Sequence, residues 1–375
     1  MKNKLTRGFC PTLKKPIFAE DGLLVRFRPS MNSMRSDNLK TLCDLSEKYG
    51  SGIMEITSRG SLQIRGIAKL SYKKFVERVL SKKIFEKPGD DNSNIIINPF
   101  WNANDRNFQI YNTLAKYKFK NLPEKFGFIV DLGNVPCLRN ISGDIRIENS
   151  DNEKLLVRAD GSDKGKELNP NEVEKFIVNL TNWFLNNKEK NINRMSQLLL
   201  IKKLPKEWCQ DKSKSKCYNI LPSNCEQGQI VGIKFGRFFA KNLKNLLVKS
   251  LTPRVRITPF KMIILEQVKN YKDNNFIFNS RNQFLNLSAC VGKNHCTNSL
   301  IDTYELAKKI KGKTKLKVHV TGCEKNCGIT KETQILLSGR KDFINFFDFR
   351  SQECNKIQKN LNDFSSELFK DKDKL

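Results

Sequence analysis

The sequence has little of several features that common protein classes need. Only two of its 375 residues are histidine, and aromatic residues make up 9%. No stretch approaches ~18 uninterrupted apolar residues, so a membrane-spanning helix is not expected. Neither a G-x-G-x-x-G after a strand pattern nor a P-loop is present, which argues against direct nucleotide binding. The basic N-terminus lacks an apolar core of signal-peptide length and favours a cytoplasmic protein.

Acidic residues are also scarce relative to basic ones. The chain has 68 Lys and Arg residues against 39 Asp and Glu residues, a net charge of +29. Nucleic acid, an anionic membrane surface, an acidic protein or a polyanionic small molecule would each suit that charge. Because the lysines are spread along the whole chain, compositional drift explains the surplus equally well. An RNA-binding protein with a metal site is a further alternative, but the interleaved aromatic and basic residues of single-strand binders are missing.

Two segments of the chain repeat one another. Residues 23–67 have the pattern of a strand, a helix that ends at Gly50 and a hairpin around Gly60. Residues 230–266 have the same order, with two strands that meet at Thr258. This duplication predicts an α+β protein built on two ferredoxin-like half domains. The apolar positions that define the two helix faces are Leu39, Leu42, Leu45 and Tyr49 in the first and Ala240, Leu243 and Leu247 in the second.

A mixed α/β segment follows each repeat. In the first we expect a strand over residues 126–133 and a polar loop over residues 149–172, and a lysine- and serine-rich linker over residues 206–219 joins the halves. The predicted units are a first half domain (1–92), a first mixed domain (93–215), a second half domain (216–278), a cysteine-bearing domain (279–349) and a tail (350–375).

Four of the eleven cysteines form two pairs in the last third of the chain. Cys290 and Cys296 have the spacing C-x5-C, and Cys323 and Cys327 have C-x3-C. A predicted helix over 297–310 and a strand over 315–320 separate the pairs, so each pair lies on a loop where four sulfurs can converge. Four thiolates suit Zn²⁺ or a [4Fe–4S] cluster, and the x5 spacing exceeds the usual zinc pattern. Four buried, unreactive cysteines are the alternative.

These cysteine motifs, downstream of the two hairpins, resemble those of the sulfite/nitrite reductase haemoprotein superfamily. Within it, the segments RGFCPTLKKPIFAEDGLLVRFRP, LPEKFGFIVDLG, RVRITPFKMIIL and KVHVTGCEKNC are similar to segments of the precorrin-3B synthase family. The resemblance implies duplicated ferredoxin-like half domains, each followed by a mixed α/β domain that binds an iron–sulfur cluster or a tetrapyrrole. It also implies that the four cysteines hold a [4Fe–4S] cluster, and that in sirohaem members Cys327 bridges to the haem iron.

The implied activity is the O2-dependent hydroxylation and lactonisation of precorrin-3A in aerobic cobalamin (vitamin B12) biosynthesis. Electrons would pass through the cluster from a separate donor, a ferredoxin or an NAD(P)H-dependent reductase. The alternative is a sirohaem-dependent assimilatory sulfite or nitrite reductase. Lys125 matches the first lysine of a K-x-K motif that holds sirohaem carboxylates, but the second is Gly127, as in precorrin-3B synthases. Ser93 replaces an expected arginine, and Lys293 and His295 replace small or apolar residues of the cluster loop.

Arginines that alternate along a strand face one side of a sheet, and a guanidinium binds a carboxylate bidentately, so this face is a candidate site for the carboxylates of a tetrapyrrole. A solvated sheet face is the alternative. The candidate carboxylate-binding residues are Arg26, Arg28, Arg59, Arg65, Lys125, Arg254 and Arg256.

A mononuclear non-haem iron is a further possible cofactor. Its usual facial triad of two histidines and one carboxylate would need both histidines of the chain, His295 and His319. His319 lies on a predicted strand among lysines and is equally consistent with a surface position. The catalytic residues that would activate O2 are not assigned.

Overall fold

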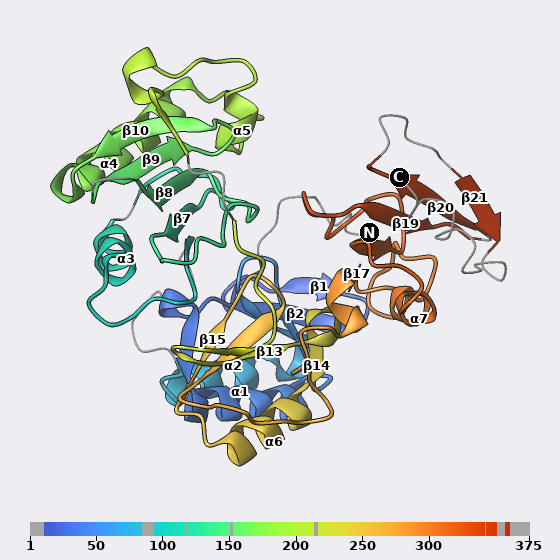
Figure 1. Ribbon diagram of the computed structural model, residues 1–375. Helices are drawn as coiled ribbons and strands as arrows, with labels where there is room; N and C mark the ends of the chain where they lie inside the picture. Colours follow the sequence, from blue (N-terminus) through green and yellow to red (C-terminus); the bar gives the residue numbers. More distant parts are fainter. Residues whose placement is uncertain are drawn as a thin grey trace.

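The computed structural model has three lobes (Figure 1). The two repeats together form one lobe, the first mixed domain forms a second, and the cysteine-bearing segment forms a third. Within the ranges described, no helix has both the length and the apolar character needed to cross a bilayer. The structure describes residues 11–84, 94–117, 119–150, 153–213, 217–341, 343–350 and 357–360.

The first repeat forms a five-stranded sheet with the order β1-β2-β5-β4-β14. The predicted helix is α1 (Ser36–Tyr49), and it ends at Gly50 as expected. The predicted hairpin is β4 and β5, and a second helix, α2, follows it. The remaining bounds are β1 Ile17–Ala19, β2 Gly22–Phe27, β4 Ile53–Ile56, β5 Leu62–Ile67 and α2 Tyr72–Ser81.

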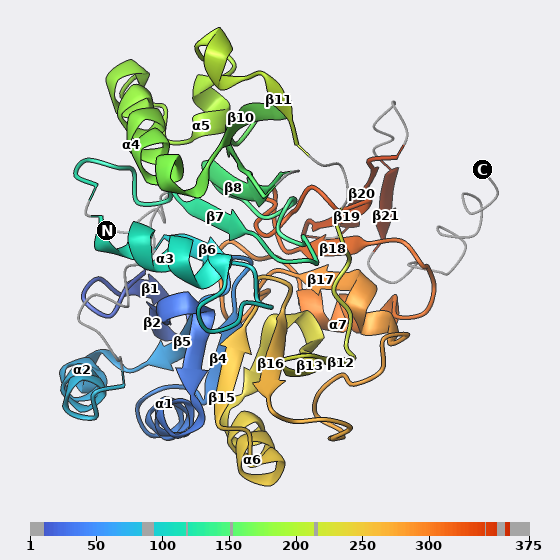
Figure 2. The same cartoon turned by 60° about the vertical axis from the view of Figure 1, so that its left-hand side comes forward.

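The second repeat forms an equivalent sheet with the order β12-β13-β16-β15-β3. Its helix is α6 (Ala240–Ser250), which lies beside α1 beneath the two sheets (Figure 2). The duplicated α+β architecture predicted from the sequence is therefore confirmed. The strand bounds are β12 Asn224–Cys225, β13 Gly228–Gly232, β15 Arg254–Ile257 and β16 Met262–Glu266.

Each repeat contributes an edge strand to the sheet of the other. From the second repeat, β14 (Arg237–Phe239) pairs antiparallel with β4, and Arg237 lies opposite Glu55. From the first repeat, β3 (Ser33–Arg35) pairs antiparallel with β15. A 3₁₀ turn precedes each exchanged strand, at Ser30–Asn32 and at Lys234–Gly236. The exchange was not predicted from the sequence.

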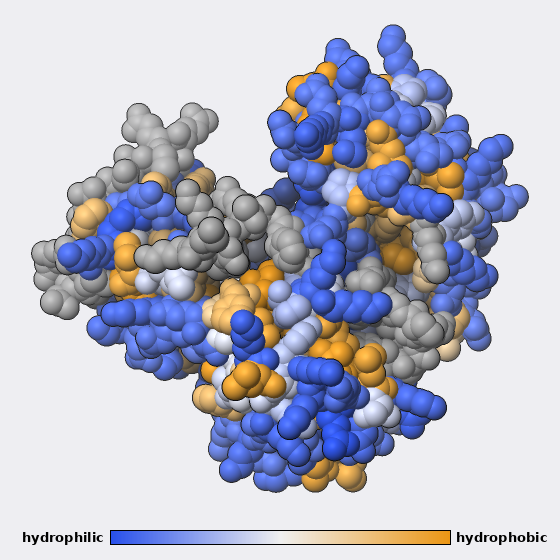
Figure 3. Space-filling view, turned by 180° about the vertical axis from the view of Figure 1, so that it is seen from behind, coloured by the Kyte–Doolittle hydropathy of each residue, from blue (hydrophilic) through white to orange (hydrophobic). Residues whose placement is uncertain are grey.

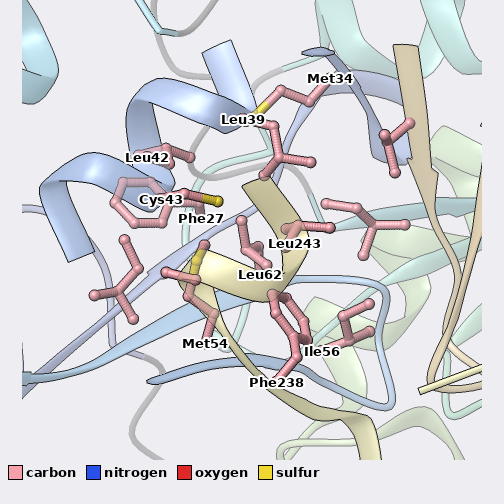
Figure 4. Packing of buried hydrophobic residues seen from close by; sticks show 14 of the residues in the cluster. Phe27, Met34, Leu39, Leu42, Cys43, Met54, Ile56, Leu62, Phe238 and Leu243 are labelled. Atoms are coloured by element: carbon pink, nitrogen blue, oxygen red, sulfur yellow. The ribbon is translucent and has the colours of Figure 1, made fainter. Parts of the chain in front are cut away.

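The two repeats share a single hydrophobic core (Figure 4). Leu42 and Cys43 of α1 are fully buried in it, together with Met54 of β4. Leu243 of α6 and Phe238 of β14 enter the same cluster from the second repeat. Because burying one such side chain contributes roughly 1.5–3 kcal/mol, the shared core binds the repeats firmly to each other.

The first mixed domain contains a six-stranded sheet with the order β11-β10-β9-β8-β7-β6. The predicted strand over 126–133 is β7, which is parallel to β6 and β8. The expectation of a polar loop over 149–172 is wrong, because Leu155 and Val157 are buried on a strand that pairs with both of its neighbours. The bounds are β6 Ile95–Ile97, β7 Phe128–Asp131, β8 Ile145–Asn149, β9 Leu155–Ala159, β10 Lys164–Leu168, β11 Asp211–Lys212, α3 Arg106–Lys116, α4 Pro170–Asn187 and α5 Met195–Leu198.

The cysteine-bearing lobe has a five-stranded sheet with the order β17-β18-β19-β20-β21. Its helix α7 (Thr303–Lys309) is shorter than the predicted 297–310, because the Asp302 carboxylate caps it by accepting bonds from the amides of Tyr304 and Glu305. The last strand lies within the segment predicted as a tail. The strand bounds are β17 Leu287–Ala289, β18 Val318–Thr321, β19 Ile335–Gly339, β20 Phe343–Asp348 and β21 Ile357–Asn360.

Candidate functional site

A cavity of about 700 Å³ lies where the lobes meet. In the space-filling view, hydrophobic residues gather in the hollow between the lobes, whereas the outer surface is mainly hydrophilic (Figure 3). Both repeats, the first mixed domain and the cysteine-bearing lobe contribute to the cavity wall. A second cavity, of about 660 Å³, borders the first mixed domain, and none of the predicted site residues is among the residues that line it.

The two cysteine loops leave the carboxyl ends of adjacent parallel strands, β17 and β18. The Cys290 amide donates to the carbonyl of Val320 (2.9 Å), and the Leu300 amide donates to the carbonyl of Gly322 (2.8 Å). The amide of Gly322 donates to the Cys290 sulfur at 3.2 Å. Amide bonds to sulfur are typical of the surroundings of metal-bound thiolates. Cys290 also lines the cavity.

Three of the four thiols are close enough to influence one another. Burial raises the pKa of Cys323, the Lys325 amide opposes this, and the nearby Cys296 and Cys290 raise it further. Cys327 is exposed. In the described part of the chain no three His, Cys, Asp or Glu side chains stand at metal-binding distances. Four cysteine thiols on two neighbouring loops fit an iron–sulfur cluster. To bind one, the four sulfur atoms would have to come closer together than they are in this structure.

His319 is buried, contrary to the alternative of a surface position. Its Nε2 lies 2.8 Å from the carbonyl oxygen of Cys327, so Nε2 carries the proton and donates. Its Nδ1 lies 2.7 Å from the hydroxyl of Ser288, which donates to it. Burial, reinforced by repulsion from Lys261, lowers the pKa of His319 to about 4. Both ring nitrogens of His319 are therefore engaged in hydrogen bonds with the protein, and the bond from Nε2 fixes the loop of Cys327.

His295 lies apart from His319 and contacts the first repeat. Its Nδ1 is 3.0 Å from Asp21 Oδ2, and its carbonyl accepts a bond from Arg65 Nη2 at 3.0 Å. The structure therefore does not bring the two histidines and a carboxylate together as a facial triad within the described residues. It shows instead that the loop of Cys296 is attached to β5.

Most of the predicted carboxylate-binding arginines are engaged by the protein itself. Arg26 lines the cavity, and its guanidinium donates to Gln63 Oε1 at 2.9 Å. Arg65 forms ion pairs with Asp21 (3.0 Å) and Glu55 (3.3 Å) and is buried. These contacts differ from the open cationic strand face that the alternation of residues predicts.

Arg28 and Arg59 turn toward the first mixed domain. Arg28 donates to the Ser61 hydroxyl at 3.2 Å and to Asn94. Arg59 Nη1 donates to the carbonyl of Lys125 at 2.9 Å, and a Cβ added at Gly127 would lie 2.2 Å from Arg59 Nη2. The guanidinium of Arg59 thus occupies the space in which a side chain at position 127 would begin.

Arg254 and Arg256 join the second repeat to the first repeat and to the first mixed domain. Arg254 Nε donates to the Ser33 hydroxyl of the exchanged strand at 3.3 Å. Arg256 pairs with Glu266 at 2.7 Å, and its guanidinium lies over the Trp101 ring. Neither arginine lines the cavity, and neither does Lys125. Ser93 and residues 1–10 lie outside the described ranges.

Besides Arg26, cations that were not predicted from the sequence line the cavity. Arg194 forms an ion pair with Asp144 at 2.9 Å, and Lys317 pairs with Glu332. Lys261 is half-buried at the tip of the β15–β16 hairpin. Burial lowers the pKa of Lys261 to about 8, although Glu55 and Cys290 act in the opposite direction. Lys261 occupies the position of Gly60 in the other hairpin, and a lysine in place of this turn glycine was the available signal.

Comparisons with known proteins agree with this architecture. Residues 19–80 match the family model described as the nitrite/sulfite reductase ferredoxin-like half domain. A stretch of 75 residues is 40% identical to a precorrin-3B synthase of Sinorhizobium sp; it makes up 20% of this chain and 16% of that relative.

The structure also resembles that of the Mycobacterium tuberculosis NirA protein. The TM-score is 0.66 at 13% sequence identity, and the match covers 90% of this chain and 77% of that chain. This similarity extends over the whole set of lobes, whereas the sequence matches are local. Residues 19–80 are therefore similar to the nitrite/sulfite reductase ferredoxin-like half domain, within a chain whose fold resembles that of NirA.

Proposed function

We propose that this chain is an oxidoreductase of the precorrin-3B synthase type, which uses O2 to hydroxylate precorrin-3A with formation of a lactone. The observation that carries the proposal is the cavity of about 700 Å³ with Cys290 in its wall. Its volume lies within the range of pockets that bind organic ligands and cofactors. The 40% identity over 75 residues supports this reaction over others found on the same fold.

In this proposal Cys290, Cys296, Cys323 and Cys327 hold a [4Fe–4S] cluster, which supplies electrons one at a time when bound. The chain itself donates an amide to the Cys290 sulfur and orients the Cys327 loop through His319. Insertion of one oxygen atom of O2 releases the other as water and consumes two electrons. We assign no protein ligands to a mononuclear iron.

We propose that the electrons come from a separate acidic carrier, such as a ferredoxin or the acidic face of an NAD(P)H-dependent reductase. Lys293 and Lys325 are exposed on the two cysteine loops, together with the apolar side chain of Ile329. Opposite charge accelerates such encounters, and salt screens the effect. The rate of cluster reduction should therefore fall as ionic strength rises.

The test of the activity is turnover of precorrin-3A under ¹⁸O2 with a chemical reductant. The product should contain one ¹⁸O atom, because a monooxygenase inserts a single atom of O2. Mass spectrometry of the product reads this directly. Absence of any conversion by protein with a full complement of iron and sulfide would contradict the proposal.

The assignment of the cluster is tested separately. Cys323→Ser and Cys327→Ser should each lose iron, acid-labile sulfide and activity together, because a hydroxyl is a poor substitute for a thiolate ligand. Cys225→Ser, on β12 and outside the two loops, should retain all three. An intact cluster in both loop variants would exclude these cysteines as ligands.

A sirohaem-dependent sulfite or nitrite reductase is the second candidate, favoured by the half-domain match. Against it stands the space at position 127, which the Arg59 guanidinium fills in place of a second lysine. The visible spectrum of protein purified anaerobically from sirohaem-producing cells distinguishes the two. Haem bands beside the cluster would favour the reductase, and a broad brown absorption without them would favour the hydroxylase.

A further inference from the structure

The two hairpin tips of the repeats have the same backbone turn. The Thr57 amide donates to the carbonyl of Ser61 (2.9 Å), and the Thr258 amide donates to the carbonyl of Met262 (3.0 Å). The third residue after each threonine has a left-handed backbone, with φ of 64° at Gly60 and 59° at Lys261. Glycine adopts this conformation freely, whereas any other L-residue is disfavoured there by ~1 kcal/mol or more.

The side chains around the two tips are exchanged between the repeats. In the first repeat, Asn32 donates its amide to the carbonyl of Gly60 at 2.8 Å and covers the glycine. In the second repeat the two residue types change places: Gly236 takes the position of Asn32, and Lys261 takes the position of Gly60. A Cβ added at Gly236 would lie 3.0 Å from Lys261 Cγ. Gly236 thus leaves room for the lysine stem, and the amide of Ile233 fixes the lysine backbone by donating to its carbonyl at 3.0 Å.

This arrangement places the Lys261 side chain in the cavity wall, near Cys290 and His319. Within the described residues its ammonium makes no hydrogen bond or ion pair, although Glu55 and Cys290 act on it electrostatically. Three other cations of the wall differ in this respect, whereas the exposed Lys331 also makes no hydrogen bond or ion pair within the described residues. Arg194 and Lys317 are paired with carboxylates, and Arg26 is bonded to Gln63.

A residue in a disfavoured conformation, with a charged group facing a cavity, indicates a functional role for that group. We propose that Lys261 binds an oxyanion in this cavity, namely a carboxylate of the tetrapyrrole, close to Cys290. This inference rests on the proposed function. The cavity thereby has a proposed ligand contact on the second repeat, at a residue outside the set of arginines that the strand alternation singled out.

The test is binding of uroporphyrin III, a stable macrocycle with eight carboxylates, to the full chain with its cluster, followed by fluorescence anisotropy. Lys261→Met should raise the dissociation constant about tenfold, because a charge-assisted bond is lost. Lys261→Arg should stay within about twofold of the original, as should Lys249→Met, which removes the same charge from the exposed face of α6. Lys261→Gly copies the first repeat and relieves the left-handed backbone, so it gives a folded variant even where Lys261→Met does not.

The outcomes separate the two proposals. Binding of uroporphyrin that is equal in the original protein, Lys261→Met and Lys261→Gly would overturn the role of Lys261 and leave the proposed function intact. No binding to the original protein would overturn both. Calorimetry with sulfite identifies the other source of an oxyanion: loss of sulfite binding in Lys261→Met with unchanged uroporphyrin binding would overturn the carboxylate assignment and favour the reductase.

Discussion

The two strand exchanges between the repeats are alike in backbone and different in chemistry. Where β14 joins β4, Arg237 forms a buried ion pair with Glu55 at 2.6 Å, and Arg65 contacts the same carboxylate. Where β3 joins β15, Arg254 contacts the neutral hydroxyl of Ser33 at 3.3 Å. A duplicated backbone therefore carries a charged junction, with an arginine–carboxylate pair, and a hydroxyl junction, with an arginine–serine contact.

The difference follows from what each junction faces. Glu55 lines the cavity, near Lys261 and the ring of Tyr304, over which the Arg237 guanidinium lies. The charged junction is thus part of the wall of the proposed ligand site. At the hydroxyl junction, backbone pairing and the shared core also join the exchanged strand to its sheet.

The largest effect is expected from removing the charge of the first junction. Glu55→Gln leaves Arg237 and Arg65 without their shared carboxylate, which should cost about 3–5 kcal/mol of unfolding free energy. Urea denaturation measures the loss. A loss under about 1 kcal/mol would show that the two junctions are energetically equivalent despite their different side-chain contacts.

Acidification should weaken the same junction. Burial alone would raise the pKa of Glu55, but Arg237 and Arg65 lower it below its ordinary value of 4.5. A carboxylate with a lowered pKa stabilises the folded state above pH 4.5, and the stabilisation is lost as the pH falls below that value. Unfolding free energy measured from pH 6 to pH 3 should therefore fall less steeply for Glu55→Gln than for the original protein.

The next largest loss of unfolding free energy is expected from a substitution at Gly127, which lies against Arg59. Gly127→Ala places a methyl group 2.2 Å from Arg59 Nη2 and 2.8 Å from the carbonyl of Asn94, so Arg59 must leave the Lys125 carbonyl. The loss of the hydrogen bond and the displacement should cost about 2 kcal/mol. In an Arg59→Ala background the same substitution should cost less, and the difference in a double-mutant cycle gives the coupling. An equal loss of unfolding free energy in both backgrounds would mean that the added methyl group strains only the contact with the Asn94 carbonyl.

The packing over Gly60 should show a smaller effect. Asn32→Ala removes the bond to the Gly60 carbonyl and puts alanine at a φ of 53°, where asparagine is better tolerated, so about 1–2 kcal/mol should be lost. Asn32→Gly reproduces Gly236 of the second repeat and relieves the backbone, so its loss should be the smaller of the two. Thermal unfolding compares them, and a larger loss for Asn32→Gly would contradict the proposed exchange of side chains.

The smallest effect is expected at the hydroxyl junction. Ser33→Ala removes one bond between neutral hydroxyl and guanidinium, and about 0.5–1 kcal/mol should be lost. This variant is the matched control for Glu55→Gln, since each removes the partner of an arginine at an exchanged strand. A loss as large as that of Glu55→Gln would remove the distinction between the junctions.

Local patterns predicted much of the fold. The faces of α1 and α6 follow from apolar residues at helical spacing, and Gly50 ends α1 as expected. The recurrence of strand, helix and hairpin predicted the duplication. The strand exchange could not be predicted, because β3 and β14 are three residues long and their pairing partners are set by contacts between distant parts of the chain.

For the site, the sequence predicted which cysteines lie on neighbouring loops, and the ligand role remains a prediction. The contacts of the arginines could not be predicted in this way, because alternation along a strand shows which face of the sheet a side chain lies on but not which residue it bonds to. Asp21 and Glu55, far from each other in sequence, both engage Arg65. Lys261 was missed because its positive φ shows only in the structure, and the alignment of the two hairpins gives no more than a lysine where the first has Gly60.

The exchange of edge strands also affects the order of events during synthesis. The chain that forms β4 leaves the ribosome long before Arg237, which is 182 residues further along than Glu55. Until β14 arrives, β4 is an open edge that can pair with other chains. Chaperones would therefore act on the nascent first repeat, and a fragment that stops after residues 19–80 would lack the strand that closes its sheet.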